Sequence, residues 1–172
     1  MANFLAHIAQ AKRNLSFLGS INRNNNDNWD WQVTVSFYTA VHLISALIAD
    51  TNNLHYDSHT DTLAAINPAA NGAQIGITED IYLAYRKLFN DSIRSRYLTV
   101  HRDEKAADYS VETAYITHSK HFKKCIVRLN TILNFISDRY QTEFPETDID
   151  CIDLRKEAAG LKYFNYRQMA AA

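Results

Sequence analysis

The chain has 172 residues and a mass of 19.7 kDa, which is the size of a single compact domain. Apolar residues make up 47% and charged residues 22%, so the chain can build a core and wholesale disorder is excluded. With 18 basic and 19 acidic residues the net charge is −1, so any binding of nucleic acid requires a local positive patch. Only 4 Gly and 2 Pro are present, which disfavours a turn-rich β-sandwich or barrel and favours long helices.

The cysteine count and the apolar patterning bear on the compartment. Cys125 and Cys151 are too few for a disulfide framework, so we expect reduced thiols of an intracellular protein. The longest apolar stretch, residues 33–49, is interrupted by serine, threonine and histidine, which disfavours a membrane span. The N-terminal residues lack the basic and apolar blocks of a signal peptide. We therefore expect a soluble, cytoplasmic protein.

Four long segments carry apolar residues every three or four positions, which is the period of an α-helix. In chain order, the predicted helices span residues 3–20, 29–49, 79–96 and 110–140. The second is apolar on nearly all sides, which predicts a central, buried helix. The third begins after Thr78, a good N-cap residue. A short helix is expected after Ser58, because Ser58 and Asp61 have the spacing of a capping box.

These elements predict an all-α fold, an antiparallel four-helix bundle with additional short helices. We expect one domain, in which residues 1–142 form the bundle. Residues 143–172 belong to the same domain and begin with an acidic segment. They end in a short helix or in an arm that docks on a partner.

The second and third predicted helices and the connection between them carry a pattern of residues typical of one family. The matching residues are Phe37-Tyr38-x-Ala40-x-His42, Ser58-His59 and Tyr85-x-x-Leu88-x-x-x-Ser92-x-x-x-Arg96-Tyr97. By their order and spacing, over residues 29–101, the chain resembles the HEPN superfamily of small helical bundles. The resemblance implies a helical bundle that forms a homodimer.

Many HEPN proteins carry an arginine and a histidine separated by four to six residues, and those that do are often metal-independent RNases. Here Arg96 and His101 are separated by four residues, and Arg94 and His101 by six; the first spacing suits the helix better. The resemblance thus implies an endoribonuclease of toxin or defence type, with no metal or cofactor. Arg96 would stabilise the phosphate, and His101 would act as general acid and base.

Arginine and histidine suit this chemistry. The planar guanidinium binds two phosphate oxygens at once and keeps its charge, and imidazole exchanges protons near neutral pH. The resemblance also implies that a homodimer brings two Arg–His pairs into one cleft and that RNA or a nucleotide is bound there. A nucleotidyltransferase-type antitoxin is a further expected partner. The remaining candidate binding residues are Arg94, Ser92, Tyr97, Arg102 and His59.

An alternative is a non-catalytic HEPN bundle. In active members the residue after the arginine is commonly Asn, Asp or His, whereas Tyr97 follows Arg96 here. Such a bundle would bind a nucleotide, RNA or a protein, and Arg94, Arg96 and Arg102 would form a small anion-binding patch.

A third hypothesis is a metal-binding helical bundle. His118, His121 and Cys125 are spaced three and four residues apart, which places them on one face of a helix. Against this hypothesis, no Glu-x-x-His motif accompanies them. We expect His118 to pack in the core and His121 at its edge, and we expect His42 to be a hydrogen-bonded core histidine.

Overall fold

The computed structural model describes residues 3–70, 75–97, 99–100, 112–113 and 117–168, and most of them are helical. The helices are α1 (Phe4–Asn24), α2 (Trp29–Asn52), α3 (His59–Ala65), α4 (Glu79–Tyr97) and α5 (Ser119–Tyr140). The strands are β1 (Thr99–Val100), β2 (Glu112–Thr113), β3 (Thr147–Ile149) and β4 (Phe164–Tyr166), and the two 3-10 helices are η1 (Ile152–Leu154) and η2 (Ala158–Gly160). The predominantly helical class predicted from the sequence is confirmed.

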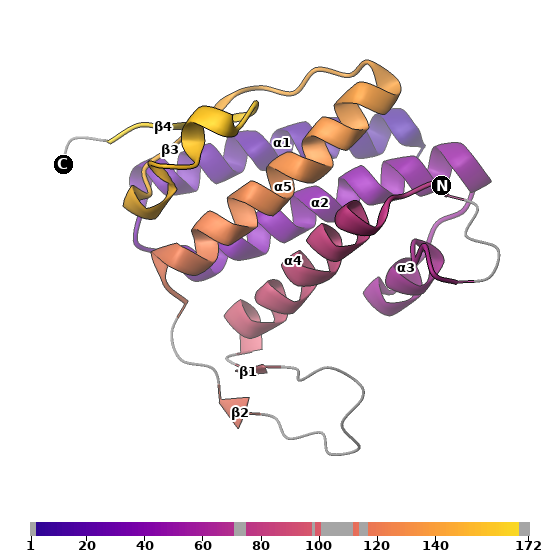
Figure 1. The fold of residues 1–172 in the computed structure, drawn as a ribbon, viewed down its shortest axis with the longest axis horizontal. Helices are drawn as coiled ribbons and strands as arrows, with labels where there is room; N and C mark the ends of the chain where they lie inside the picture. The colour runs from indigo at the N-terminus through magenta and orange to yellow at the C-terminus, as the bar shows by residue number, and fades with distance from the viewer. Residues whose placement is uncertain (1–2, 71–74, 98, 101–111, 114–116, 169–172) are drawn as a thin grey trace.

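Helix α2 lies at the centre of the helical layer and contacts α1, α4 and α5 (Figure 1). Residues on nearly every side of it are fully buried, as the sequence predicts; they include Val33, Phe37, Ala40, Leu43, Ile44 and Leu47. By length and composition α2 could cross a membrane, with a mean hydropathy of 1.5 over its most apolar 18 residues. Because 72% of that window is buried inside the protein, a core helix explains its composition.

Two of the predicted helix starts are confirmed. The Asp61 backbone N–H donates to the Ser58 hydroxyl at 3.0 Å, so Ser58 caps α3. Helix α4 begins at Glu79, directly after Thr78, with acidic residues in its first turn where the helix dipole favours them. The ends are less well predicted, since α1 and α2 continue to Asn24 and Asn52.

The predicted start of the last long helix, near Ser110, is wrong. Glu112 and Thr113 form β2, which pairs antiparallel with β1, and α5 begins only at Ser119. His118 is the N-cap in an extended conformation, and its backbone N–H donates to Nδ1 of His121 at 3.0 Å. His118 is therefore exposed and not in the core. The apolar period holds from Phe122 onward, where α5 is buried against α2 and α4.

The C-terminal segment forms two 3-10 helices and a parallel pair of strands, β3 and β4, where the sequence predicted a short helix or an arm. It packs on the protein's own α1 and α5. Its apolar residues Ile149, Leu154 and Phe164 are fully buried in the common core. The Asn130 side chain of α5 accepts hydrogen bonds from the Lys162 and Tyr163 backbone N–H groups, both at 3.1 Å.

A buried amide network fastens this segment to the turn between α1 and α2. Asn22 and Gln32 are both fully buried, and Asn22 Nδ2 donates to Gln32 Oε1 at 2.7 Å. The Asp150 backbone N–H donates to Asn22 Oδ1 at 2.7 Å. Gln32 Nε2 donates to the carbonyls of Asn25 and Asn26 at 3.2 and 3.1 Å. The network satisfies polar groups that would otherwise be costly to bury.

Candidate functional site

Arg96 lies in the last turn of α4, and its guanidinium is oriented by neighbours on two helices. Its Nε donates to the Ser92 carbonyl at 3.2 Å, and Nη2 donates to the Ser92 hydroxyl at 3.4 Å. Across the interface with α2, Nη1 donates to the Tyr38 hydroxyl at 3.4 Å. Ser92 is itself buried, and its hydroxyl donates to the Phe89 carbonyl at 2.8 Å, which fixes the acceptor that Arg96 uses.

Two tyrosine rings also contact the Arg96 guanidinium. Its carbon lies 5.8 Å from the centre of the Tyr38 ring and 5.2 Å from that of the Tyr97 ring. These are cation–π distances. Tyr97 is 64% exposed, so this side of the site is open to solvent. Arg96 is thus held in place and remains half-buried at the surface.

His59, the first residue of α3, joins the same cluster. Its ring lies edge-on to Phe37 at 5.0 Å and to Tyr38 at 6.1 Å, and contacts Phe89 at 5.7 Å. Burial lowers the pKa of His59, and the nearby Arg96 charge lowers it further. The imidazole is therefore neutral at physiological pH and can accept a proton or a hydrogen bond.

No carboxylate neutralises Arg96 among the residues that the structure describes. The ion pairs in that part of the chain all lie elsewhere, at His55–Asp57, Lys123–Glu157, Arg128–Asp91 and Arg167–Asp148. Among the described residues, Arg96 instead uses neutral partners, which orient the side chain without neutralising its charge. Guanidinium groups held in this way suit the binding of phosphate oxygens.

Arg94 faces another part of the molecule. Its charge contributes, after burial, to lowering the pKa of His121 at the start of α5. Residues two apart on a helix point in different directions, so Arg94 and Arg96 do not share a face. Of the residues predicted for the site, the structure brings together Arg96, Ser92, Tyr97 and His59. His101 and Arg102 lie outside the described residues.

Tyr38 was not predicted as a site residue, although it belongs to the motif on which the family resemblance rests. The contact between His42 and His7 was not predicted either. Nδ1 of His42 and Nδ1 of His7 are 3.1 Å apart, so His42 is hydrogen-bonded as predicted, but it is only half-buried. The His55 ring stacks on that of His7 at 5.5 Å. No local sequence pattern indicates this cluster of histidines, because His7, His42 and His55 come from three separate segments of the chain.

The metal hypothesis finds no support in the geometry. Cys125 is fully buried, its thiol donates to Asp91 Oδ2 at 3.4 Å, and burial raises its pKa well above the ordinary value. His118, by contrast, is exposed at the helix start. Within the described ranges, no group of three or more histidine, cysteine or acidic side chains could hold a metal ion.

Comparison with known proteins finds no family model, no curated protein and no solved structure that matches the chain. The HEPN resemblance therefore rests on the residue pattern over residues 29–101 alone.

Proposed function

We propose that the protein is a HEPN-type, metal-independent endoribonuclease of the toxin or defence type, acting in the cytoplasm. Under this proposal the four long helices form the antiparallel four-helix bundle of that superfamily. The contacts of α2 with α1, α4 and α5, and of α4 with α5, support the arrangement. The observation that carries the functional proposal is the Arg96 guanidinium, which is oriented by Ser92 and Tyr38 and pairs with no carboxylate in the described part of the chain.

In the proposed reaction the 2′-hydroxyl of a ribose attacks the adjacent phosphate, and the bond from phosphorus to the next 5′-oxygen breaks. The attacking hydroxyl gives its proton to a base, and the leaving oxygen receives one from an acid. His101 is the proposed acid and base, since histidine titrates near neutral pH. Arg96 binds the phosphate oxygens, on which negative charge accumulates in the transition state.

The proposal includes a homodimer whose two Arg–His pairs share one cleft. It also includes a nucleotidyltransferase-type antitoxin as a partner. Both follow from the family resemblance. The second candidate function is a non-catalytic bundle that binds RNA, a nucleotide or a protein through the same cluster. Tyr97 favours this alternative, because an exposed aromatic ring follows Arg96 where active members commonly have a polar residue.

The deciding experiment measures RNA cleavage by purified protein in excess chelator. Wild type is compared with Arg96→Ala and His101→Ala. The control is Arg155→Ala, because Arg155 is an exposed arginine that directly follows η1 and lies outside the site. We expect cleavage by wild type and by the control and its loss in both site variants. Cleavage that requires a divalent metal, or that both site variants retain, would contradict the proposal. RNA binding that depends on Arg96 without cleavage would support the non-catalytic alternative.

A further inference from the structure

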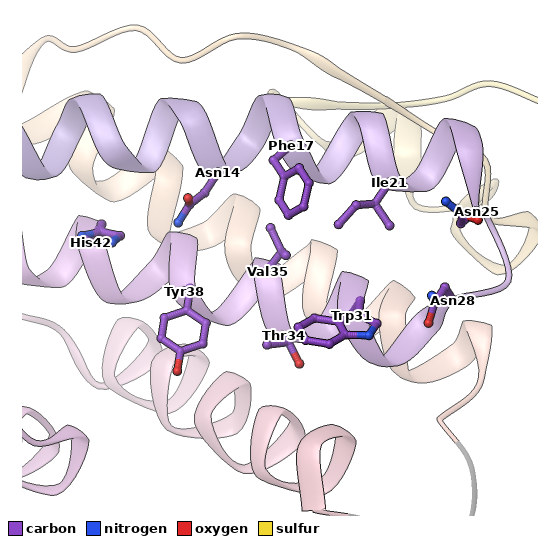
Figure 2. A pocket seen from close by; sticks show the side chains of 10 residues that line it. All are labelled: Asn14, Phe17, Ile21, Asn25, Asn28, Trp31, Thr34, Val35, Tyr38 and His42. Carbon is purple, nitrogen blue, oxygen red and sulfur yellow. The ribbon is translucent and has the colours of Figure 1, made fainter.

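A groove with a volume of about 600 Å³ lies along the surface where α1 and α2 meet, as Figure 2 shows. The residues that line it include three with aromatic side chains and three with amide side chains, which are Phe17, Trp31, Tyr38, Asn14, Asn25 and Asn28. Its size falls within the range of pockets that bind small organic ligands.

The aromatic rings of the groove are unusually open to solvent. Trp31 is 62% exposed, Phe17 is 56% exposed and Tyr38 is 37% exposed. A single exposed apolar side chain requires no explanation, but a cluster along one groove indicates a binding surface. Flat rings that remain accessible favour a flat ligand, because it can stack on them.

The amides of the groove have hydrogen-bonding groups to spare. Asn28 is the N-cap of α2, yet its side chain makes no capping hydrogen bond. Asn14 uses its oxygen to accept from Gln10 Nε2 at 2.9 Å, and within the described part of the chain its own N–H₂ group makes no hydrogen bond. A primary amide offers both donors and acceptors, which matches the edge of a nucleobase.

The groove is continuous with the Arg96 site through one residue. Tyr38 lines the groove, extends from α2 toward α4 in Figure 2, and contacts Arg96 Nη1 at 3.4 Å through its hydroxyl. One turn further along α2, His42 also lines the groove, and Arg13 lies near enough to it for its charge to lower the His42 pKa. None of the described residues lining the groove is acidic. A ligand with a flat ring and a phosphate can therefore occupy the groove and reach a cation.

We propose that this groove binds an unpaired base of single-stranded RNA, stacked on Trp31 and Phe17, while a neighbouring phosphate contacts Arg96. This rests on the proposed function for the identity of the ligand, and it adds a base-binding subsite that lies outside the Arg–His pair. Stacking on aromatic side chains tolerates every base, so the subsite selects unpaired RNA and not a particular sequence.

The test measures binding, independently of cleavage. A short fluorescent oligoadenylate whose 2′-hydroxyls are methylated cannot undergo attack by the 2′-oxygen, so its affinity is measured by anisotropy with no product formed. We expect Trp31→Ala and Phe17→Ala each to weaken binding about tenfold. Trp31→Phe, which keeps a ring, should retain most of the affinity. Leu5→Ala is the matched control, because Leu5 is an apolar residue of α1 that is 71% exposed and lies outside the groove.

A second probe guards against an effect on folding. Replacing bases of the RNA by abasic residues should weaken binding to wild type more than binding to Trp31→Ala, because that variant keeps only the Phe17 ring for stacking. Unchanged affinity in both alanine variants would overturn the proposal, as would the absence of RNA binding by wild type. A change in oligomeric state in Trp31→Ala, with RNA affinity unchanged, would overturn it too and assign the groove to contacts between copies of this chain.

The two proposals fail in different ways. If the protein cleaves unmethylated RNA in excess chelator, and if replacing Trp31 or Phe17 changes neither cleavage nor binding, the nuclease proposal is supported and the base-binding subsite is contradicted. If binding depends on those two rings but no cleavage occurs, the base-binding subsite is supported and the nuclease proposal is contradicted.

Discussion

The Nδ1 atoms of His7 and His42 face each other at 3.1 Å across the contact between α1 and α2. Only one of them can carry the proton of this hydrogen bond, so the pair is compatible with two neutral rings and opposes two charged ones. Burial lowers the pKa of both residues, and the neighbouring His55 lowers both further. The unfolded chain therefore binds more protons than the folded one once the pH falls below about 6.5.

Stability is accordingly expected to fall on acidification. Above a pH of about 7 the contribution of this pair is constant, and it declines as the pH drops through the unfolded pKa of histidine. Urea unfolding at about pH 8 and about pH 5 measures the difference. His42→Gln should flatten the pH dependence, because it removes one of the two rings whose pKa burial lowers. A steeper loss in His42→Gln would contradict the assignment.

Replacing Arg96 by lysine keeps the charge and removes the planar fork that contacts Ser92 and Tyr38 together. We expect Arg96→Lys to bind single-stranded RNA more tightly than Arg96→Ala but more weakly than wild type, since a point charge is not oriented by those acceptors. The salt dependence separates charge from geometry. The slope of log affinity against log salt should fall by about 0.7 in Arg96→Ala and stay near the wild-type value in Arg96→Lys. Equal slopes in all three proteins would exclude a phosphate contact.

The C-terminal segment is expected to be an integral part of the core. Phe164 is fully buried, so Phe164→Ala should lower the free energy of unfolding by about 3–5 kcal/mol. Ile152→Ala, in the same segment at a residue 62% exposed, is the matched control and should cost little. Denaturant unfolding compares the two. A similar, small effect of both substitutions would mean that this segment is docked only loosely.

Neither cysteine is expected to react with a thiol reagent in the folded protein. Cys125 has no exposed surface and Cys151 is 1% exposed, and burial raises the pKa of both thiols. Raised pKa values leave almost no reactive thiolate at neutral pH. Labelling should therefore be slow in native buffer and fast in denaturant. Rapid modification of one cysteine in native buffer would show that its segment opens readily.

The helices were predictable because their signals are local. The Ser58 cap, the acidic first turn of α4 and the apolar period of α2 each act within a few residues of where they stand in the sequence. The start of α5 could not be predicted in this way. The apolar period in the sequence continues backward from α5 through residues 111–118, but Glu112 and Thr113 form β2 and pair with β1. Two-residue strands carry too few residues for an alternating apolar pattern, so their pairing leaves little trace in the sequence.

In the candidate site, too, contacts within one helix could be predicted and contacts between helices could not. The contact of Arg96 with Ser92 joins residues four apart on one helix, and the motif spacing anticipates it. The contact with Tyr38 spans 58 residues, and the His59 ring reaches the cluster from a third helix. These contacts depend on how the helices pack, which the sequence pattern does not specify. The groove beside Tyr38 has the same origin, since it exists only once α1 and α2 lie together.

The buried amide of Asn22 has a consequence for the order of events during synthesis. It joins the α1–α2 turn to Asp150, a partner 128 residues further along the chain. A nascent chain can form both helices and the local bonds of their turn early, yet the bond from the turn to Asp150 forms only after residue 150 has left the ribosome. Contacts so distant in sequence form slowly, because a long loop must close first. Translation that stops before this point would yield helices whose turn lacks its hydrogen bond to the C-terminal segment.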